Sequence, residues 1–270
     1  MKDQQCIEFL QWVLPKLHMR WRGFRKVRKQ VCKRIHRRIR ELNLSGIHDY
    51  KEFLEQNKDE WNTLDTFCRI TISRFYRNNK IFDKIGMELL PIIYQKMDKV
   101  RCWSTGCASG EEPYSISLIF QNLIANISPY KEIEIIATDA DPNMLERAKK
   151  ACYSASTVKE LPERWKQDCF SMNNDSYCLK DEFKKPVTLL KQDIRKEQPT
   201  GTFDLILCRN LVATYFDEDL QKKVLASITS KLTSQGFLIL GKNEKTDALP
   251  DEMETWNQHE RIFRKTGNPQ

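Results

Sequence analysis

Trp103-Ser-Thr-Gly-Cys-Ala-Ser-Gly-Glu-Glu-Pro-Tyr-Ser115 is the segment that decides the fold. It follows an apolar segment at 99–104, which reads as a short buried strand, and precedes residues 116–124, in which apolar side chains recur at helical spacing. Gly106 and Gly110 therefore lie in the turn between strand and helix, where the missing Cβ lets a ligand approach the backbone. A glycine turn in this place is typical of α/β folds that hold a cofactor.

The start of the predicted helix carries two adjacent carboxylates, Glu111 and Glu112. Ser109 and Glu112 match the Ser-x-x-Glu pattern of a capping box, in which the two side chains satisfy free N–H groups of the first turn. A dinucleotide-binding turn leaves those N–H groups to a pyrophosphate, whereas two carboxylates repel phosphate and attract a cation. S-adenosylmethionine carries a sulfonium and an ammonium group and no phosphate, so it fits this turn. The alternative is an ordinary capped helix of the core without a ligand.

The composition is that of a soluble globular protein. With 270 residues, 40% of them hydrophobic and 30% charged, the chain has room for one large or two small domains. It contains no run of about 18 apolar residues, which excludes a transmembrane helix. The segment Met1-Lys-Asp-Gln-Gln-Cys6 lacks the basic and then apolar pattern of a signal peptide, so we expect a cytoplasmic protein.

Nine cysteines are scattered along the chain without a Cys-x-x-Cys pair. Several fall within the strand and helix patterns, where cysteine acts as a small buried hydrophobic residue. We therefore expect reduced thiols, with neither a disulfide framework nor a metal site.

The positive charge of the chain is concentrated near its beginning. Residues 16–40 contain twelve Lys or Arg and no acidic residue, while the rest of the chain is slightly acidic. Apolar residues recur every four positions there, which predicts an amphipathic helix at 23–42 with its bases around one apolar stripe: Val27, Val31, Ile35 and Ile39. Such a helix can dock on RNA, on anionic lipid or on an acidic protein helix, or it can be a solvated face without a partner. Aromatic residues are missing between Arg25 and Arg40, which disfavours stacking on single-stranded bases.

The pattern along the chain changes near residue 98. Before it, helices are expected at 7–18, 23–42, 49–57 and, in one or two pieces, 60–85. After it, predicted strands at 99–104, 132–138, 186–191, 203–208 and 236–241 alternate with helices at 110–126, 142–150 and 217–232, and a last strand is expected at 261–264. This alternation predicts a parallel sheet covered on both faces.

Residues 153–185 interrupt the alternation. They are polar, contain Leu161-Pro162 and include a short strand candidate around 177–179. We expect a small antiparallel flap here, inserted near the edge of the sheet where substrate is selected.

Polar residues follow several of the predicted strands. Asp139 and Asp193 each follow one, and Asp204-Leu-Ile-Leu-Cys-Arg-Asn210 ends another. Ligands gather at the carboxyl ends of the strands in such sheets, and one carboxylate can accept hydrogen bonds from both hydroxyls of a ribose. An isolated aspartate after a strand is more often a cap or turn residue, but several spaced strand ends together favour a ligand site.

Four motifs in this order resemble those of CheR-type methyltransferases: Arg69-Ile-Thr-Ile-Ser-Arg-Phe-Tyr-Arg77, Gly110-Glu-Glu-Pro-Tyr-Ser115, Ala137-Thr-Asp-Ala-Asp141, and Leu207-Cys-Arg-Asn210 with Tyr215-Phe-Asp217. Enzymes of this family methylate glutamate side chains of chemotaxis receptors with S-adenosylmethionine. The resemblance implies an α/β, Rossmann-like class I methyltransferase with a mostly parallel seven-stranded sheet. It places an all-α N-terminal domain at 1–85 and a methyltransferase domain at 86–270, with the flap inserted at about 153–188. We expect a monomer.

The resemblance also implies how the cofactor is held. Gly106 lies in the cofactor turn, Glu112 holds the amino group and Asp139 the ribose, while Asp193 and Ile194 contact the adenine.

Other implied cofactor residues lie at the edge and floor of the pocket. Thr71, Ser73 and Arg77 form its inter-domain edge, with Arg77 reaching the carboxylate of the cofactor and the reaction centre. Arg209 and Asn210 form its floor. Without the resemblance, Arg77 is equally well explained as a surface ion pair.

Catalysis by such an enzyme depends mainly on alignment. A glutamate side chain is already ionised at neutral pH, so methyl transfer needs little acid or base assistance. We assign Arg77 and Tyr215 to positioning the attacking oxygen.

The chain departs from the family pattern at two places. Thr214 occupies the usual tyrosine position and Tyr215 comes one residue later, and Gly241-Lys-Asn-Glu244 replaces the usual Gly-His-Ser-Glu. These changes bear on the methyl acceptor. We expect an acidic, receptor-like protein helix, docked by the basic helix and the flap. The alternatives are a small molecule or RNA as acceptor, with RNA less favoured, or a non-catalytic cofactor-sensing adaptor.

Overall fold

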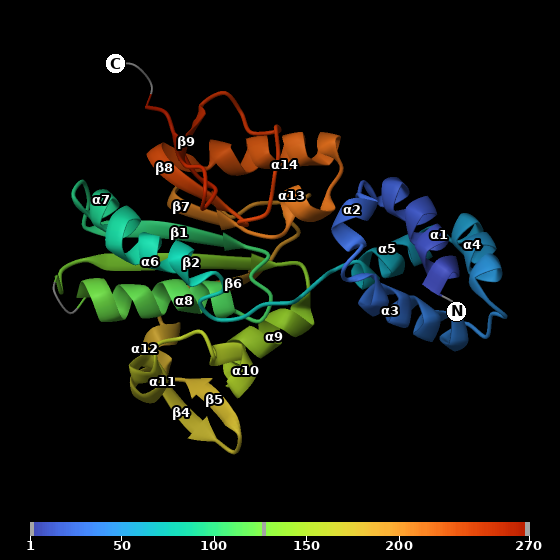
Figure 1. The fold of residues 1–270 in the computed structure, drawn as a ribbon, viewed down its shortest axis with the longest axis horizontal. Coiled ribbons are helices and arrows are strands. Elements are labelled where there is room, and N and C mark those ends of the chain that lie inside the picture. Colours follow the sequence, from blue (N-terminus) through green and yellow to red (C-terminus); the bar gives the residue numbers. More distant parts are fainter. Residues whose placement is uncertain (1–2, 126–127, 268–270) are drawn as a thin grey trace. The chain divides into compact units, whose positions relative to one another are not determined.

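The computed structural model describes residues 3–125 and 128–267. The chain forms two compact units, Met1–Ile70 with Val212–Gln221 and Thr71–Leu211 with Lys222–Gln270. We refer to the first as the helical unit and to the second as the sheet unit (Figure 1).

The helical unit consists of short helices around one apolar core. These are α1 (Asp3–Val13), η1 (Leu14–Leu17), α2 (Trp21–Phe24), α3 (Arg28–Glu41), α4 (Ile47–Gln56), α5 (Lys58–Phe67) and α13 (Val212–Tyr215). Three residues of the predicted apolar stripe, Val31, Ile35 and Ile39 of α3, are buried in this core. The basic residues between them therefore lie on the remaining faces of the helix. The single helix predicted at 23–42 is wrong, because α3 begins only at Arg28 and Val27, half-buried, precedes it.

The sheet unit is built on the predicted seven-stranded sheet. Its strands are β1 (Lys99–Thr105), β2 (Glu132–Asp139), β6 (Val187–Lys191), β7 (Phe203–Cys208), β8 (Leu232–Leu240), β9 (Met253–Asn257) and β10 (Ile262–Lys265). Their order is β6-β2-β1-β7-β8-β10-β9. The first five run parallel, and β10 is antiparallel to both β8 and β9. The mostly parallel sheet is confirmed, and the parallel strands end at one edge.

Helices cover this sheet and supply most of the core. They are α6 (Asn79–Lys84), η2 (Ile85–Leu89), α7 (Leu90–Tyr94), α8 (Glu111–Ile119), η3 (Phe120–Ala125), α9 (Pro142–Lys150) and α14 (Glu218–Ser230). Val100 and Cys102 of β1 are fully buried in a cluster with Ile116 and Leu118 of α8. A smaller cluster joins Ala137 of β2 to α9. The predicted helix at 60–85 is divided into α5 and α6, separated by a non-helical segment.

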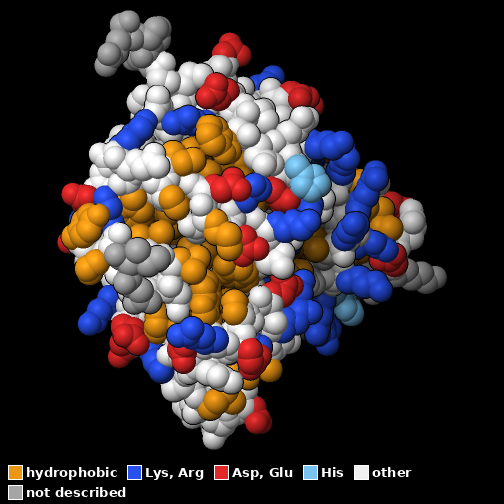
Figure 2. Space-filling view, turned by 60° about the vertical axis from the view of Figure 1, so that its left-hand side comes forward, with side chains coloured by type: hydrophobic (Ala, Val, Ile, Leu, Met, Phe, Trp, Pro, Cys, Tyr) orange, Lys and Arg blue, Asp and Glu red, His pale blue; other side chains and the backbone are white. Residues whose placement is uncertain are grey.

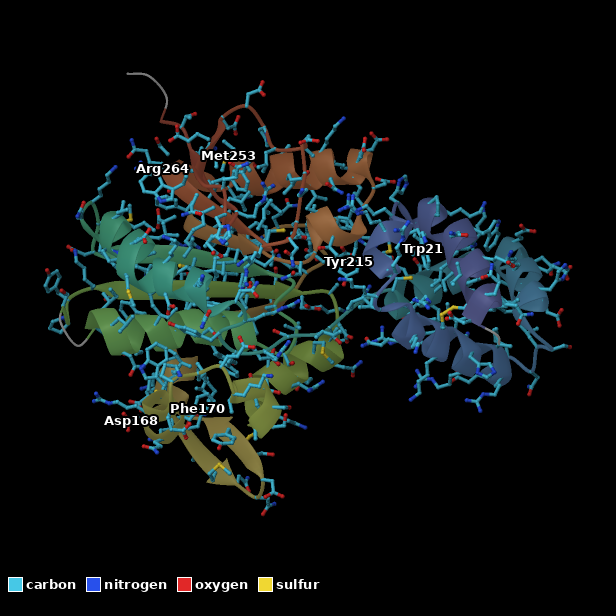
Figure 3. All side chains as sticks on the ribbon, in the orientation of Figure 1. Trp21, Asp168, Phe170, Tyr215, Met253 and Arg264 are labelled. Atoms are coloured by element: carbon cyan, nitrogen blue, oxygen red, sulfur yellow. A yellow bond between two sulfur atoms is a disulfide. The ribbon has the colours of Figure 1, made fainter. Side chains whose placement is uncertain are left out.

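The expected flap is a separate three-stranded antiparallel sheet, drawn in yellow in Figure 1. It comprises β3 (Cys152–Ser154), β4 (Phe170–Asn173) and β5 (Ser176–Leu179) in the order β3-β5-β4, with the short helices α10 (Ala155–Val158), α11 (Glu163–Cys169) and α12 (Asp181–Lys184). The ring of Phe75 packs edge-on against Tyr153 and Phe170, at centroid distances of 4.8 and 5.5 Å. Phe170 is labelled in Figure 3. These contacts attach the flap to the segment that carries Arg77.

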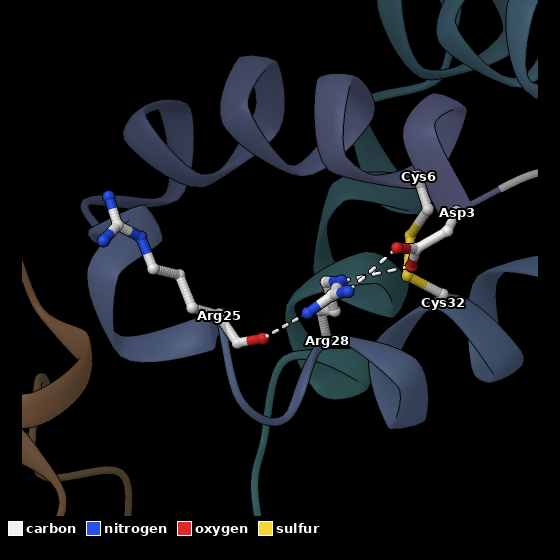
Figure 4. The surroundings of a disulfide bond; sticks show 5 residues. All are labelled: Asp3, Cys6, Arg25, Arg28 and Cys32. Atoms are coloured by element: carbon white, nitrogen blue, oxygen red, sulfur yellow. Dashed lines mark hydrogen bonds and ion pairs between the residues drawn. A yellow bond between two sulfur atoms is a disulfide. The ribbon is translucent and has the colours of Figure 1, made fainter.

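Two disulfides correct the expectation of reduced thiols. Cys6 of α1 is bonded to Cys32 of α3, beside the ion pair of Asp3 with Arg28 (Figure 4). Cys152 and Cys178 are bonded across β3 and β5, where they face each other in register. The partners in each pair are 26 residues apart, so only the packing of their elements brings the Cα atoms within 6.0 and 4.0 Å.

The following statements concern residues 3–125 and 128–267. The five other cysteines are buried and are not part of a disulfide. The described ranges contain no group of three or more His, Cys, Asp or Glu arranged to hold a metal ion. Helices within the same ranges are too short or too polar to cross a bilayer.

Candidate active site

The turn between β1 and α8 depends on its two glycines. Gly106 and Gly110 have φ angles of +62° and +91°, which favour glycine. A Cβ on Gly110 would lie 2.6 Å from the ring of Tyr114, so a side chain at this position would also clash with that ring. The N–H of Ala108 donates to Oδ2 of Asp139 at 2.8 Å. The turn is therefore held against the end of β2.

The predicted capping box is wrong. Helix α8 begins at Glu111 with Gly110 as its N-cap, one residue later than the Ser-x-x-Glu spacing requires. The physical reason is the left-handed conformation of Gly110, which moves Ser109 out of the cap position. The hydroxyl of Ser109 instead donates to Oε1 of Glu111 at 2.9 Å. Glu112 is thereby left to interact with groups on other elements.

Glu112 forms the centre of a hydrogen-bonded chain across the strand ends. Its Oε1 accepts from the hydroxyl of Ser104 at 2.8 Å, and its Oε2 accepts from Nη1 of Arg209 at 3.1 Å. Nη2 of Arg209 donates to the backbone carbonyl of Arg77 at 2.7 Å. The side chain of Arg209 is 2% exposed and lies over the ring of Phe82. The structure therefore brings together three of the predicted site residues, Glu112, Arg209 and the backbone of Arg77.

The segment before Arg77 is anchored by two buried rings. Phe75 packs on the flap, and the ring of Tyr76 stacks on Phe82 and meets Trp165 edge-on. Tyr76 has a φ of +55°, and its N–H donates to the hydroxyl of Ser115 at 3.0 Å. Nη1 of Arg77 donates to the carbonyl of Ile72 at 3.0 Å. The sequence predicts the ring anchors, whereas this turn of the guanidinium back onto its own segment was not expected.

Glu111 is a buried carboxyl group at the same helix start, with 3% of the residue exposed. Burial raises its pKa, and hydrogen bonds from its own N–H and from the hydroxyls of Ser109 and Ser73 oppose that rise. Ser73, a predicted pocket residue, is thus placed beside α8, while Thr71 lies half-buried at the start of the same segment. The sequence shows Glu111 only as one of two carboxylates at a helix start, and its burial is not visible from the local pattern.

Asp139 and the turn of Asp193 lie together at the ends of β2 and β6. Asp139 accepts hydrogen bonds from the N–H groups of Ala108 and Asp141, both at 2.8 Å, and its carbonyl accepts from the N–H of Gln192 at 3.1 Å. Two backbone donors therefore fix the direction of the carboxylate of Asp139.

Asp193 has a local partner. Its Oδ2 forms an ion pair with Nη2 of Arg195 at 2.6 Å, and its Oδ1 accepts from the N–H of the same residue at 3.0 Å. Ile194, between them, is 7% exposed. The side chain of Asp193 thus behaves as a turn residue, while Ile194 supplies an apolar surface next to it.

Glu244 is a residue of the site that the sequence did not single out. Its carboxylate accepts from the backbone N–H groups of Asn210, Leu211 and Gly241, and Asn210 has a φ of +56°. The residue is 4% exposed. The sequence offers one signal for it: Glu244 comes three positions after Gly241, which follows a predicted strand. The two residues between them depart from the family pattern.

Tyr215 belongs to α13 in the helical unit, whereas Arg77 belongs to the sheet unit. The ring of Tyr215 packs against Phe24 at a centroid distance of 5.0 Å, and its carbonyl accepts from the N–H of Arg20 at 2.8 Å. Nε of Arg20 donates to the carbonyl of Thr214 at 3.1 Å. Tyr215, labelled in Figure 3, thus contributes to the packing of the helical unit.

The charges of the site suit a cationic, hydroxyl-bearing ligand. Carboxylates at Glu112 and Asp139 face the strand ends, and Arg209 is their cationic neighbour. Within the described chain, Nε of Arg209 is buried and makes no hydrogen bond, so this guanidinium retains donor capacity. S-adenosylmethionine presents an ammonium, a carboxylate and two ribose hydroxyls, and these residues fit it. A phosphate would meet the carboxylates at the start of α8.

Comparison with known proteins places these residues in one family. The family model described as "CheR methyltransferase, SAM binding domain" matches residues 71–262. The "Probable chemotaxis protein methyltransferase" of Rhizobium etli is 30% identical, over 80% of this chain and 83% of that protein. The "Chemotaxis protein methyltransferase" of Listeria innocua is 29% identical, over 73% and 74%. The crystal structure of the N-methyltransferase NodS from Bradyrhizobium japonicum with S-adenosylhomocysteine is 13% identical with a TM-score of 0.39, over 68% of this chain and 87% of that chain.

Proposed function

Because the chain belongs to the CheR methyltransferase family, and is therefore an S-adenosylmethionine-dependent methyltransferase, we propose that it methylates glutamate side chains of a chemotaxis receptor. The observation that carries this proposal is the chain of hydrogen bonds from Ser104 through Glu112 and Arg209 to the backbone of Arg77. It joins the cofactor turn after β1 to the segment that begins the sheet unit. The relatives named for chemotaxis support a receptor as the methyl acceptor.

In this proposal the carboxylate of Glu112 binds the ammonium group of the cofactor, and Asp139 binds the ribose hydroxyls. Ser104 and Arg209 already fix the direction of Glu112, and two backbone amides fix Asp139. Both carboxylates are therefore oriented before a ligand arrives, which lowers the entropy cost of binding. The remaining proposed contacts are Thr71, Ser73, Arg77, Gly106, Asp193, Ile194, Arg209 and Asn210.

When bound, S-adenosylmethionine supplies an electrophilic methyl group on its sulfonium. The acceptor glutamate is ionised at neutral pH, so the residues of the chain have to orient it rather than activate it. We propose that Arg77 and Tyr215 position its carboxylate. Arg77 is suited to this because a guanidinium pairs with a carboxylate through two parallel hydrogen bonds. The aromatic anchors of Phe75 and Tyr76 hold its backbone in place.

The basic side of α3 is our proposed docking surface for the receptor. Arg28, Arg34 and Arg38 bind groups of their own unit, namely Asp3, the carbonyls of Phe67 and Arg69, and Glu60. Four other bases of α3 are exposed, and we call them the basic face: Lys29, Lys33, Arg37 and Arg40. Arg37 forms an exposed ion pair with Glu41 at 3.4 Å, which an acidic partner can replace. Figure 2 shows Lys and Arg side chains gathered over the helical unit. An acidic receptor helix is complementary to this surface.

The flap is the second proposed docking element. Its order β3-β5-β4 leaves β3 and β4 as edge strands, and Met172 of β4 is 62% exposed. An edge strand offers backbone donors and acceptors to an extended peptide. We also propose that the chain acts as a monomer in the cytoplasm.

A labelling experiment tests the proposed reaction. The protein is incubated with radiolabelled S-adenosylmethionine and lysate of its own cell, and labelled protein is treated with mild alkali. Release of labelled methanol identifies a carboxyl methyl ester, as we expect. Alkali-stable label, label that ribonuclease removes, or label on a small molecule would exclude glutamate methylation. Cofactor binding without any transfer would favour the cofactor-sensing adaptor.

A further inference from the structure

The carboxylate of Glu244 joins the ends of two neighbouring strands. Its Oε2 accepts from the N–H groups of Asn210 at 2.8 Å and Gly241 at 2.6 Å, and its Oε1 accepts from the N–H of Leu211 at 3.1 Å. Asn210 and Leu211 follow β7, Gly241 follows β8, and the last residues of these parallel strands pair in register. One buried carboxylate therefore holds both strand ends.

The surrounding backbone is shaped for this carboxylate. A Cβ on Gly241 would lie 2.7 Å from Oε2 of Glu244 and 2.9 Å from Oδ1 of Asn210, so any side chain there would displace the carboxylate from its present position. Asn210 adopts a φ of +56°, in a region that is costly for a residue with a Cβ. The hydrogen bond from its N–H to Glu244 compensates part of that cost.

The strand end held by Glu244 is the one that carries Arg209. The guanidinium of Arg209 binds Glu112 and the carbonyl of Arg77, which are both proposed to contact the cofactor. The direction in which this side chain leaves β7 depends on the backbone at Asn210. We infer that Glu244 is a positioning residue for cofactor binding, which acts through Arg209 and Asn210 without touching the cofactor. This inference rests on the proposed cofactor site.

A second buried carboxylate provides a matched control at the opposite end of β7. Asp204 accepts from the N–H of Arg101 and from the hydroxyl of Thr233, both at 2.9 Å, and is 6% exposed. It also ties neighbouring strands together, but at the edge away from the strand ends that carry the site. Asp204→Asn therefore shows how the loss of a buried carboxylate changes the stability of the protein when that carboxylate lies away from the site.

The test measures the affinity for S-adenosylhomocysteine by calorimetry and the melting temperature of the same samples. We compare the full chain with Glu244→Gln, Gly241→Ala and Asp204→Asn. Because an amide replaces a charged acceptor of three N–H groups, Glu244→Gln should weaken binding by about tenfold or more. Asp204→Asn should lower the melting temperature and leave affinity unchanged at a temperature where it is folded.

Gly241→Ala keeps the carboxylate but displaces it, so it should weaken binding similarly. Combining it with Glu244→Gln should add little, since both changes act on one contact. It also serves as the second variant should Glu244→Gln fail to fold.

The outcomes are distinct. Weaker binding by the Glu244 and Gly241 variants, with the Asp204 variant unchanged, supports the inference. Wild-type affinity in a folded Glu244→Gln protein overturns it and leaves the proposed function intact. Equal loss of affinity in all three variants, or full additivity in the double variant, also overturns it. Failure of the wild-type protein to bind S-adenosylhomocysteine would overturn both the inference and the proposed function.

Discussion

Arg209 and Glu112 form an ion pair at the strand ends, with Nη1 and Oε2 3.1 Å apart and the side chains 2% and 15% exposed. The proposed ligand for the ammonium of the cofactor is therefore already neutralised by a residue of the pocket floor. Since Ser104 binds the other oxygen, the carboxylate keeps its direction while Arg209 balances its charge. In the free enzyme the two residues stabilise each other as an ion pair, and in the proposed complex both contact the cofactor.

Replacement of Glu112 by glutamine should affect both roles. The change removes the charge that attracts the ammonium group, so affinity for S-adenosylhomocysteine should fall about tenfold or more. It also leaves the buried guanidinium of Arg209 without its counter-charge, which should lower the free energy of unfolding by about 3 kcal/mol. Calorimetry and chemical unfolding measure the two effects. Glu134→Gln, which breaks a partly exposed ion pair with Arg101, is the matched control. It should retain both the affinity and the free energy of unfolding of the wild type. Unchanged affinity in Glu112→Gln would exclude it as the ammonium ligand.

Removal of the Arg77 side chain should lower turnover more than stability. Its guanidinium donates to the carbonyl of Ile72, while the anchoring contacts of this segment come from Phe75 and Tyr76. Arg77→Ala should reduce kcat/KM for receptor methylation by about 10²-fold, in line with loss of one positioned donor, and keep its near-ultraviolet circular dichroism. Arg74→Ala is the control from the same segment, since its ion pair with Glu160 is partly exposed. Equal activity of the two variants would contradict the assignment.

Replacement of Tyr215 tests whether this tyrosine, one residue later than in the family pattern, takes part in catalysis. Tyr215→Phe removes only the hydroxyl and retains the ring contact with Phe24, so the melting temperature should change little. Turnover should fall about tenfold if the hydroxyl positions the acceptor. The control is Tyr130→Phe, since Tyr130 is 67% exposed. Full activity of Tyr215→Phe would remove this residue from the proposed catalytic pair.

The sequence predicts the central parallel strands well because β1, β2 and β7 are short apolar runs whose residues are mostly buried. It does not predict β9, whose residues Met253–Asn257 are mostly exposed and polar at the edge of the sheet. An edge strand needs no continuous apolar pattern. The ends of the parallel strands, and with them Glu112, Asp139 and Arg209, are brought to one edge as the α/β pattern implies.

Contacts between distant segments account for what the sequence did not predict. Glu244 and Asn210 are 34 positions apart, and the two cysteines of each disulfide are 26 apart. No local periodicity encodes such pairs. The capping box fails for a different reason, since the left-handed φ of Gly110 shifts the helix start by one residue. Burial of Glu111 likewise follows from tertiary packing.

The buried carboxyl of Glu111 should make stability depend on pH. Burial raises its pKa above the ordinary value of 4.5, so the folded protein binds this proton more tightly than the unfolded chain. The protonated group favours folding at low pH, and this contribution is lost as the pH rises through the folded pKa. Glu111→Gln should therefore be more stable than the wild type at neutral pH, and the difference should shrink as the pH falls toward 4.5.

Urea unfolding between pH 4.5 and 7.5 checks this. Glu146→Gln is the control, because Glu146 is exposed on α9 and its hydrogen bond with Lys149 lowers its pKa. This variant should not be more stable than the wild type at neutral pH. A difference between Glu111→Gln and wild type that is constant across the pH range would show that ionisation of Glu111 is not its cause.

Charge reversal on the basic face should impair receptor methylation without affecting the cofactor. Lys29 and Lys33 are exposed on α3, while the buried stripe of Val31 and Ile35 holds the helix in its core. Lys29→Glu combined with Lys33→Glu should lower kcat/KM for the receptor by about tenfold at low salt, because the acidic partner is then repelled during encounter.

Raising the salt to about 0.5 M should narrow the difference in kcat/KM between this double variant and the wild type, since exposed charges are screened. Affinity for S-adenosylhomocysteine should match the wild type. The double variant Lys222→Glu and Lys223→Glu makes the same charge change on exposed positions of α14 and serves as the control. An equal loss in both double variants would indicate a dependence on net charge alone, and would argue against docking of the receptor on α3.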